Sequence, residues 1–168
     1  PTTPWTPEST PSGAYAMEIT SGFTVDTWSQ TGGGGIGNVN LTKGNIFLAS
    51  QNATAMSFGM NLAIASGVSL TLSIGEATTA AGPYTIVSST ALGTVPSGAQ
   101  IHRAMGLSVP FVTGRYYWFG ASWSGGNGTQ YYTTSGASSD PAWGSFQSGA
   151  WGSTAPSSTW TPESRPSG

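Results

Sequence analysis

The chain has 168 residues and a formal net charge of −2, and only 6% of its residues are charged, against about 25% in ordinary soluble domains. Its four basic residues cannot form the Lys/Arg clusters that bind nucleic acid or anionic membranes, so neither is an expected partner. Because the chain has no cysteine, a disulfide framework and a thiolate zinc site are excluded.

The same composition indicates one folded domain with a surface of low charge. The length fits a single domain of about 100–200 residues, and 11% aromatic residues argue against a disordered chain. Gly, Ser and Thr supply 73 of the 168 residues, which leaves little charge to resist self-association. No apolar run of about 18 residues predicts membrane insertion. Because the sequence opens on Pro1, we expect any secretion leader to have been removed.

The two ends of the chain carry the same motif. Residues 5–13 read WTPESTPSG and residues 160–168 read WTPESRPSG, with eight of nine positions identical at an offset of 155 residues. This spacing exceeds the period of solenoid repeats, about 20–50 residues. It fits either a whole domain that recurs in a larger chain or a subunit whose two ends meet the same kind of surface. Residues 1–13 and 153–168 are rich in Pro, Ser and Thr, which predicts extended tails or linkers.

Between the tails, residues 14–152 are predicted to form an antiparallel β-sandwich, jelly-roll-like, with about ten short strands. Apolar residues alternate with small or polar ones from Met56 to Ile64 and from Val68 to Ile74, the period of a half-buried strand. The expected strands lie near 15–19, 23–28, 36–41, 45–49, 56–64, 68–74, 84–88, 99–109, 115–123, 129–134 and 143–151. Turn residues predict breaks at 42–45 (TKGN), 66–69, 82–83, 96–98, 124–128 and 140–141, and a single helical turn at 76–81.

Aromatic residues gather in the segment 115–123 (RYYWFGASW), which predicts a central strand buried on both faces. An alternative use for aromatic side chains is stacking on sugar rings. The candidates for such a glycan-binding face flank the Gly-rich stretch 124–128, and they are Trp123, Tyr131, Tyr132 and Trp143.

No catalytic residue, metal site or cofactor is predicted. The run GGGGIG at 32–37 matches the dinucleotide fingerprint in letters, but the strand expected after it is incompatible with the required helix. His102, the only histidine, would need Asp26 or Asp140 for a triad, and no nucleophile elbow is present. The carboxylates of the body, Glu18, Asp26, Glu76 and Asp140, show no pairing of the kind that a glycosidase needs.

The only lysine and the asparagine sequons are the remaining candidates for covalent chemistry. Lys43 lies in the expected TKGN turn, where a solvated amine argues against an isopeptide staple. The pattern N-x-[ST] occurs at Asn40, Asn52 and Asn127, which are therefore candidate N-glycosylation sites. The Ser/Thr/Pro-rich tails have the composition of O-glycosylated stalks.

Several segments carry a resemblance to a class of known modules. SLTLSIGE from Ser69, GPYTIVSS from Gly82 and GRYYWFGASW from Gly114 together resemble β-sandwich modules of large, repetitive, secreted microbial surface proteins, and YYTTSG from Tyr131 fits the same picture. The resemblance implies a structural or adhesive role at the cell exterior and implies no catalytic residues.

These observations predict a non-enzymatic structural subunit or tandem-repeat unit of an extracellular filament, sheath or surface appendage. Its partners would be further copies of itself, joined through the terminal segments, with Trp5, Pro7, Trp160 and Pro162 as the assembly residues. The alternative is a carbohydrate-binding or adhesin module of a large secreted protein, with glycans as partners.

Overall fold

The computed structural model describes the backbone of residues 15–21, 24–30, 35–131 and 140–163, and the side chains of residues 42–128 and 140–163. Within these ranges the chain forms β-strands and no helix, so the prediction of an all-β fold is confirmed. The strands are β1 (Tyr15–Ser21), β2 (Thr24–Gln30), β3 (Gly35–Ala49), β4 (Ala53–Ile64), β5 (Ser69–Ala77), β6 (Tyr84–Thr94), β7 (Gly98–Phe111), β8 (Tyr116–Tyr131), β9 (Gly144–Gly152) and β10 (Thr159–Trp160).

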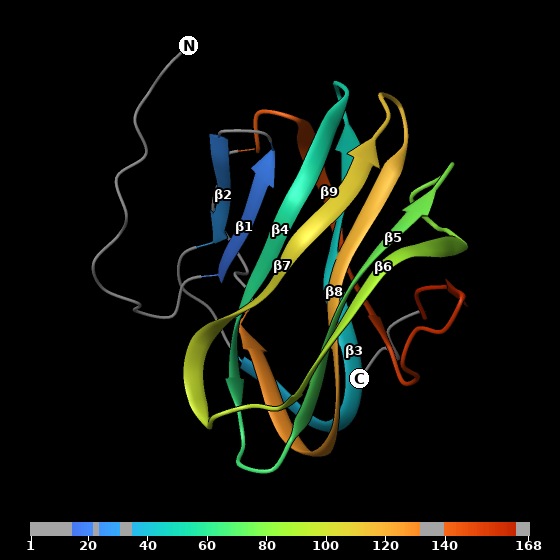
Figure 1. The fold of residues 1–168 in the computed structure, drawn as a ribbon. Coiled ribbons are helices and arrows are strands. Elements are labelled where there is room, and N and C mark those ends of the chain that lie inside the picture. The colour runs from blue at the N-terminus through green and yellow to red at the C-terminus, as the bar shows by residue number, and fades with distance from the viewer. Residues whose placement is uncertain (1–14, 22–23, 31–34, 132–139, 164–168) are drawn as a thin grey trace.

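All of these strands join in one curled antiparallel sheet. The main order is β10-β6-β5-β8-β4-β1-β2, with β3 and β9 attached through β8 and with β7 attached to β4. Figure 1 shows β1 and β2 at one end of the curl, and β5, β6 and the C-terminal segment at the other. The antiparallel arrangement is thus shown, while the two-sheet jelly-roll order stays a prediction.

Strand β8 holds the curl together because its two halves pair with different neighbours. Its first half lies between β3 and β5, with Phe119 opposite Asn45 on one side and Ile74 on the other. Near its end, Gly128 pairs with both Asn38 and Ile64, so that β8 reaches across to β4. The register shifts between these halves, as expected where a bulge bends a strand.

The main core fills the inside of the curl. Side chains alternate in direction along a strand, so Tyr117, Phe119 and Ala121 of β8 point inward together. Rings of Phe47 and Phe58 pack edge-on against Phe119 at centroid distances of 5.9 and 5.2 Å. The prediction that residues 115–123 form a central aromatic strand is therefore confirmed.

A second, smaller core lies on the opposite face of the same strands. Its members alternate with those of the main core, and they are Ile46, Ala77, Tyr84, Trp118 and Trp160. A strand that is buried on both faces needs something to cover each face. Here the C-terminal segment provides the second cover.

Two predicted turns are wrong, because continuous strands run through both segments. Residues 42–45 lie inside β3, where Lys43 pairs with Ala121 on one side and Trp151 on the other. Residues 124–128 lie inside β8, and a bulge, not a turn, accommodates the glycines. Glycine is a weak strand former, so the sequence signal favoured turns, but pairing on both sides overrides that preference. The helical turn expected at 76–81 is also wrong, since β5 continues to Ala77 and an irregular turn follows.

Tyr117 forms two hydrogen bonds with the loop that precedes β8. Its hydroxyl accepts a hydrogen bond from the Val112 amide at 2.9 Å and donates one to the Pro110 carbonyl at 3.3 Å. This is the arrangement of a tyrosine corner, in which a strand tyrosine bonds back to backbone a few residues upstream. Burial raises the pKa of Tyr117, because it disfavours the charged phenolate.

We expect Tyr117→Phe to lower the free energy of unfolding by about 1–2 kcal/mol, because the Val112 amide loses its acceptor. Chemical denaturation of the full chain measures this change. Tyr116→Phe is the matched control, since it removes a hydroxyl from the adjacent position, outside this corner. Equal stability of the two variants would contradict the role assigned to the Tyr117 hydroxyl.

Candidate functional site

The C-terminal segment returns to the body and docks on the outer face of the sheet. β10 pairs antiparallel with β6, with Trp160 opposite Tyr84, and the Ile86 amide donates to the Ser158 carbonyl at 2.9 Å. Before β10, the Thr42 hydroxyl donates to the Thr154 carbonyl at 2.8 Å. The segment is thus attached to β3 at one point and to β6 at another.

Trp160 is the centre of this attachment, and only 5% of its surface is exposed. Its ring stacks on Trp118, with centroids 4.3 Å apart and planes inclined by 28°. The ring of Tyr84 lies 6.3 Å away. On the remaining side a Cβ at Gly152 would lie 3.0 Å from Nε1 of Trp160, so this glycine leaves the room that the indole uses. We call the site formed by Trp118, Tyr84 and Gly152 the tryptophan slot.

Glycines beneath Trp118 make the slot deep enough for two stacked indoles. A Cβ at Gly44 would lie 2.6 Å from Nε1 of Trp118, and one at Gly120 would overlap the six-membered ring. These two glycines are direct neighbours across β3 and β8. Trp118 therefore lies flat on bare backbone, and Trp160 covers it. In this place the glycines serve close approach and not a turn.

A second contact anchors the residues after Trp160. The Glu163 amide donates to the Trp151 carbonyl at 2.9 Å, and the Glu163 carboxylate accepts from both the amide and the hydroxyl of Ser153 at 2.7 Å. These hydrogen bonds to Ser153 lower the pKa of Glu163, because they favour the charged form. Pro162, between the two anchors, is half-buried.

The docked residues are those of the repeated motif. Trp160, Pro162 and Glu163 belong to the WTPES copy at the C-terminus, and Trp160 was predicted as an assembly anchor. The structure places Trp160 against its own chain. Trp5 and Pro7 lie outside the described residues. The sequence offered two signals for the rest of the site: Glu163 is part of the repeat, and glycines 44 and 120 interrupt aromatic or apolar strands.

Two of the four residues predicted for a glycan-binding face, Trp123 and Trp143, are not available to a glycan. Trp123 and Trp143 are buried, with exposed fractions of 3% and 1%. Trp143 packs against Phe111 at 4.7 Å and Phe47 at 5.4 Å between ring centroids. Neither indole has an exposed ring face on which a sugar could stack, because both rings are packed in the main core. The side chain of Tyr131 and all of Tyr132 lie outside the described part.

The candidate catalytic groups whose side chains the structure describes do not lie together. His102 on β7 is buried against the main core. Its cross-strand partner on β4 is Met60, which faces inward. Glu76 accepts a hydrogen bond from Nε of Arg115 at 2.7 Å, which forms an ion pair. Asp140 accepts from the Phe146 amide at 2.8 Å and closes the turn at Pro141. The side chains of Glu18 and Asp26 are not described, and the described residues contain no cluster of three metal-ligating side chains.

Lys43 is not the solvated turn residue that was expected. It lies within β3 and is buried, with 7% of its surface exposed. The strand pairs on both sides here, so the side chain points to a face of the sheet, and its low exposure shows that this face is covered. A solvated Lys43 amine therefore no longer speaks against an isopeptide staple, which stays an untested hypothesis.

Two of the three sequons can be placed by their side chains. Asn52 and Asn127 are exposed, as a glycan acceptor must be. The Asn52 side-chain oxygen accepts from the amide and hydroxyl of Thr113, which leaves its nitrogen as the acceptor atom for a sugar. The side chain of Asn40 is outside the described set.

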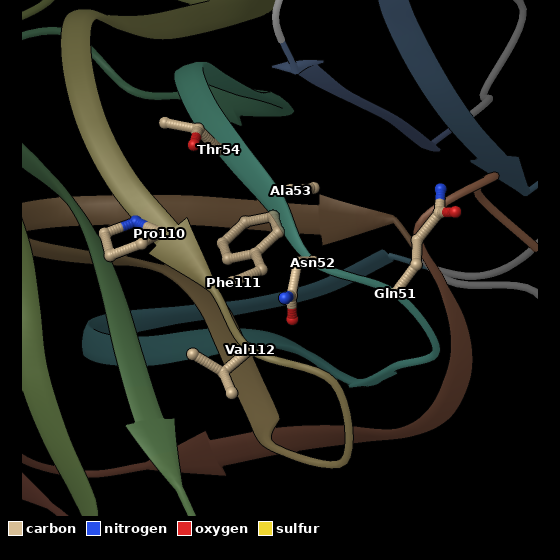
Figure 2. A pocket seen from close by; sticks show the side chains of 7 residues that line it. All are labelled: Gln51, Asn52, Ala53, Thr54, Pro110, Phe111 and Val112. Carbon is tan, nitrogen blue, oxygen red and sulfur yellow. The ribbon is translucent and has the colours of Figure 1, made fainter.

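An open depression lies beside the start of β4 and the end of β7 (Figure 2). Its lining residues are Gln51, Asn52, Ala53, Thr54, Pro110, Phe111 and Val112. None of them is ionisable, so the depression offers no general acid or base.

Comparison of the chain with models of protein families, with curated proteins and with solved structures finds no match. In the part of the chain that the structure describes, no helix is both long and apolar enough to span a membrane.

We expect Gly120→Ala to destabilise the protein by about 1–3 kcal/mol, because the new methyl group overlaps Trp118. Displacement of Trp118 should also loosen Trp160, which tryptophan fluorescence reports. Gly149→Ala is the matched control: it lies on β9, and its Cβ would have 3.9 Å of clearance. That control should change stability by no more than about 0.5 kcal/mol. A harmless Gly120→Ala would contradict the packing described here.

Stability should fall as the pH drops below about 6.5, through His102. Burial lowers the pKa of His102, partly offset by a hydrogen bond with the Leu62 backbone. A lowered pKa in the folded state means that the unfolded chain takes up the proton first, so stability is full above the unfolded pKa and declines below it. Denaturation at several pH values measures this slope. Because the chain has a single histidine, His102→Gln should remove the slope, and an unchanged slope would contradict the assignment.

Proposed function

We propose that the chain is a non-enzymatic structural module, a subunit or tandem-repeat unit of an extracellular filament, sheath or surface appendage. The observation that carries this proposal is the docking of the repeated motif. At the C-terminus the motif completes the fold, because Trp160 covers Trp118 and Glu163 binds Ser153. A motif with this role belongs to the module that precedes it.

The copy of the motif at residues 5–9 can then be explained as the closing segment of another module. If WTPES closes a module, its recurrence 155 residues earlier supports a second module of the same kind before this one. The offset is close to the length of one body plus one docked segment. The alternative arrangement, separate subunits that exchange the motif, uses the same contacts.

Contacts of this kind suit assembly into long structures. A contact between different surfaces of successive copies does not close on itself and therefore generates a filament. Strand addition supplies backbone hydrogen bonds, as β10 does on β6, and a buried tryptophan supplies a hot spot of about 2 kcal/mol or more. Low charge on the chain reduces repulsion between copies.

Further features of the proposal concern the fold and the location. We propose that the curled sheet is a jelly-roll-like sandwich, with its layers facing each other across the aromatic core. The exposed sequons at Asn52 and Asn127 support an extracellular glycoprotein. The alternative of a carbohydrate-binding or adhesin module is weaker, since Trp123 and Trp143 are buried.

Assembly of the full chain tests the proposal. Electron microscopy and sedimentation should show filaments or larger oligomers of the unaltered chain, and Trp5→Ala should shorten or abolish them, because the proposed anchor is lost. Thr10→Arg is a matched control, since it converts the one position at which the two motif copies differ into the residue of the C-terminal copy. This control should assemble like the unaltered chain.

Two results would argue against the mechanism. Filaments that persist unchanged in Trp5→Ala would remove the terminal segment from assembly. A chain that stays monomeric at all concentrations, with or without the substitution, would argue against a self-assembling subunit.

A further inference from the structure

We propose that the tryptophan slot is a receptor for the Trp-Thr-Pro-Glu motif, and that residues 5–8 of a second copy bind there in place of residues 160–163. This inference rests on the proposed function and identifies the partner and the site of contact. The chain carries the motif twice, while the slot holds one indole on Trp118.

The receptor side is complete without the docked residues. Trp118 and Tyr84 provide the aromatic walls and Gly152 provides the space. The backbone of β6 offers the edge on which β10 pairs. Ser153 provides an amide and a hydroxyl for a carboxylate, and the Trp151 carbonyl accepts an amide. All of these groups precede residue 158 and remain on the body when residues 159–163 leave.

The ligand side is fully present in the N-terminal copy. The docked groups are the Trp160 indole, which fills the slot, and the carboxylate of Glu163 three residues later, which binds Ser153; Thr-Pro separates them. Trp5 and Glu8 have the same spacing, with Pro7 at the position of Pro162. The two copies differ first at Thr10, opposite Arg165, which lies beyond the last contact to Ser153.

Mass action decides which copy occupies the slot. A tethered segment competes at an effective concentration on the order of 1 mM, so residues 160–163 fill their own slot in dilute solution. The strand that holds them has only two residues, so release costs few backbone bonds. At high local concentration, as on a surface or in a repetitive chain, a neighbouring motif can replace the resident one.

The places of β6 and β1 in the sheet favour a linear chain of copies. The slot borders β6 at one end of the strand order, whereas residues 5–8 precede β1 near the other end. Figure 1 shows β1 and β6 on opposite sides of the molecule. A contact that joins opposite ends of successive copies is heterologous and does not close.

Titration with a synthetic peptide of residues 5–13 tests the receptor directly. The full chain with both Trp5→Ala and Trp160→Ala offers an empty slot, and amide shifts in NMR spectra report binding even at millimolar affinity. We expect saturable binding of one peptide, with shifts at Trp118, Tyr84 and Ser153. The peptide with Trp5→Ala should not bind, and the peptide with Glu8→Gln should bind about tenfold more weakly, because a neutral amide replaces a charged acceptor.

A second measurement tests exchange between copies. Trp160→Ala alone keeps the N-terminal motif, so it should self-associate in sedimentation experiments more strongly than the chain with both substitutions. If either variant fails to fold, judged by amide protection in β3, β5 and β8, Glu163→Gln takes its place. This substitution keeps the buried tryptophan and should increase the affinity for added peptide relative to the unaltered chain.

The inference is overturned if the folded variant does not bind the peptide at millimolar concentration, or if the Trp5→Ala peptide binds equally well. Peptide binding without self-association of Trp160→Ala would overturn the claim that a second copy is the partner. Failure of the proposed function looks different, because a receptor for the motif can exist in a protein that never forms filaments. The peptide titration and the electron microscopy therefore fail independently.

Discussion

The stack of Trp160 on Trp118 is the contact on which the outer face of the sheet depends. Trp118 is a large aromatic residue in the middle of a central strand, and alternation forces it onto the face opposite Phe119 and Tyr117. Without a cover, its indole would be exposed on bare glycine backbone. The C-terminal segment supplies the cover, and Glu163 fixes the segment by binding Ser153. A motif that looks like part of a linker in the sequence is therefore part of the core.

This dependence links the fold to the repetition of the motif. In the proposed tandem-repeat arrangement, a segment that closes its own module recurs wherever the module recurs, and the separation of the two copies is close to one module length. In the proposed exchange between copies, the intermolecular link would use the same kinds of group as the cap within one chain: an indole, an edge strand and a carboxylate. Which of them prevails depends on local concentration, not on new contacts.

Much of the fold could be predicted from alternation alone. Met56 to Ile64 and Val68 to Ile74 have the period of two that a half-buried strand requires, and β4 and β5 lie there. The two turns predicted wrongly, at 42–45 and 124–128, have one cause, because glycine inside a strand was read as a turn signal. Gly44, Gly120 and the glycines of 124–128 lie inside long strands, where they admit Trp118 or a bulge. Trp123 and Trp143 were ambiguous for another reason, since sequence does not say which face of a sheet is covered. The role of Trp160 was predictable only as an anchor, because no local signal shows which body receives it.

The central claim is that Trp160 packs on Trp118 of the same chain. Nuclear Overhauser effects between the two indole rings, recorded on the dilute full chain, test it most directly. The account predicts strong contacts between the rings that persist on dilution, together with slow exchange of the Glu163 amide, which donates to Trp151. A Trp160 ring without contacts to Trp118, with an amide at Glu163 that exchanges as fast as in an unfolded peptide, would contradict it.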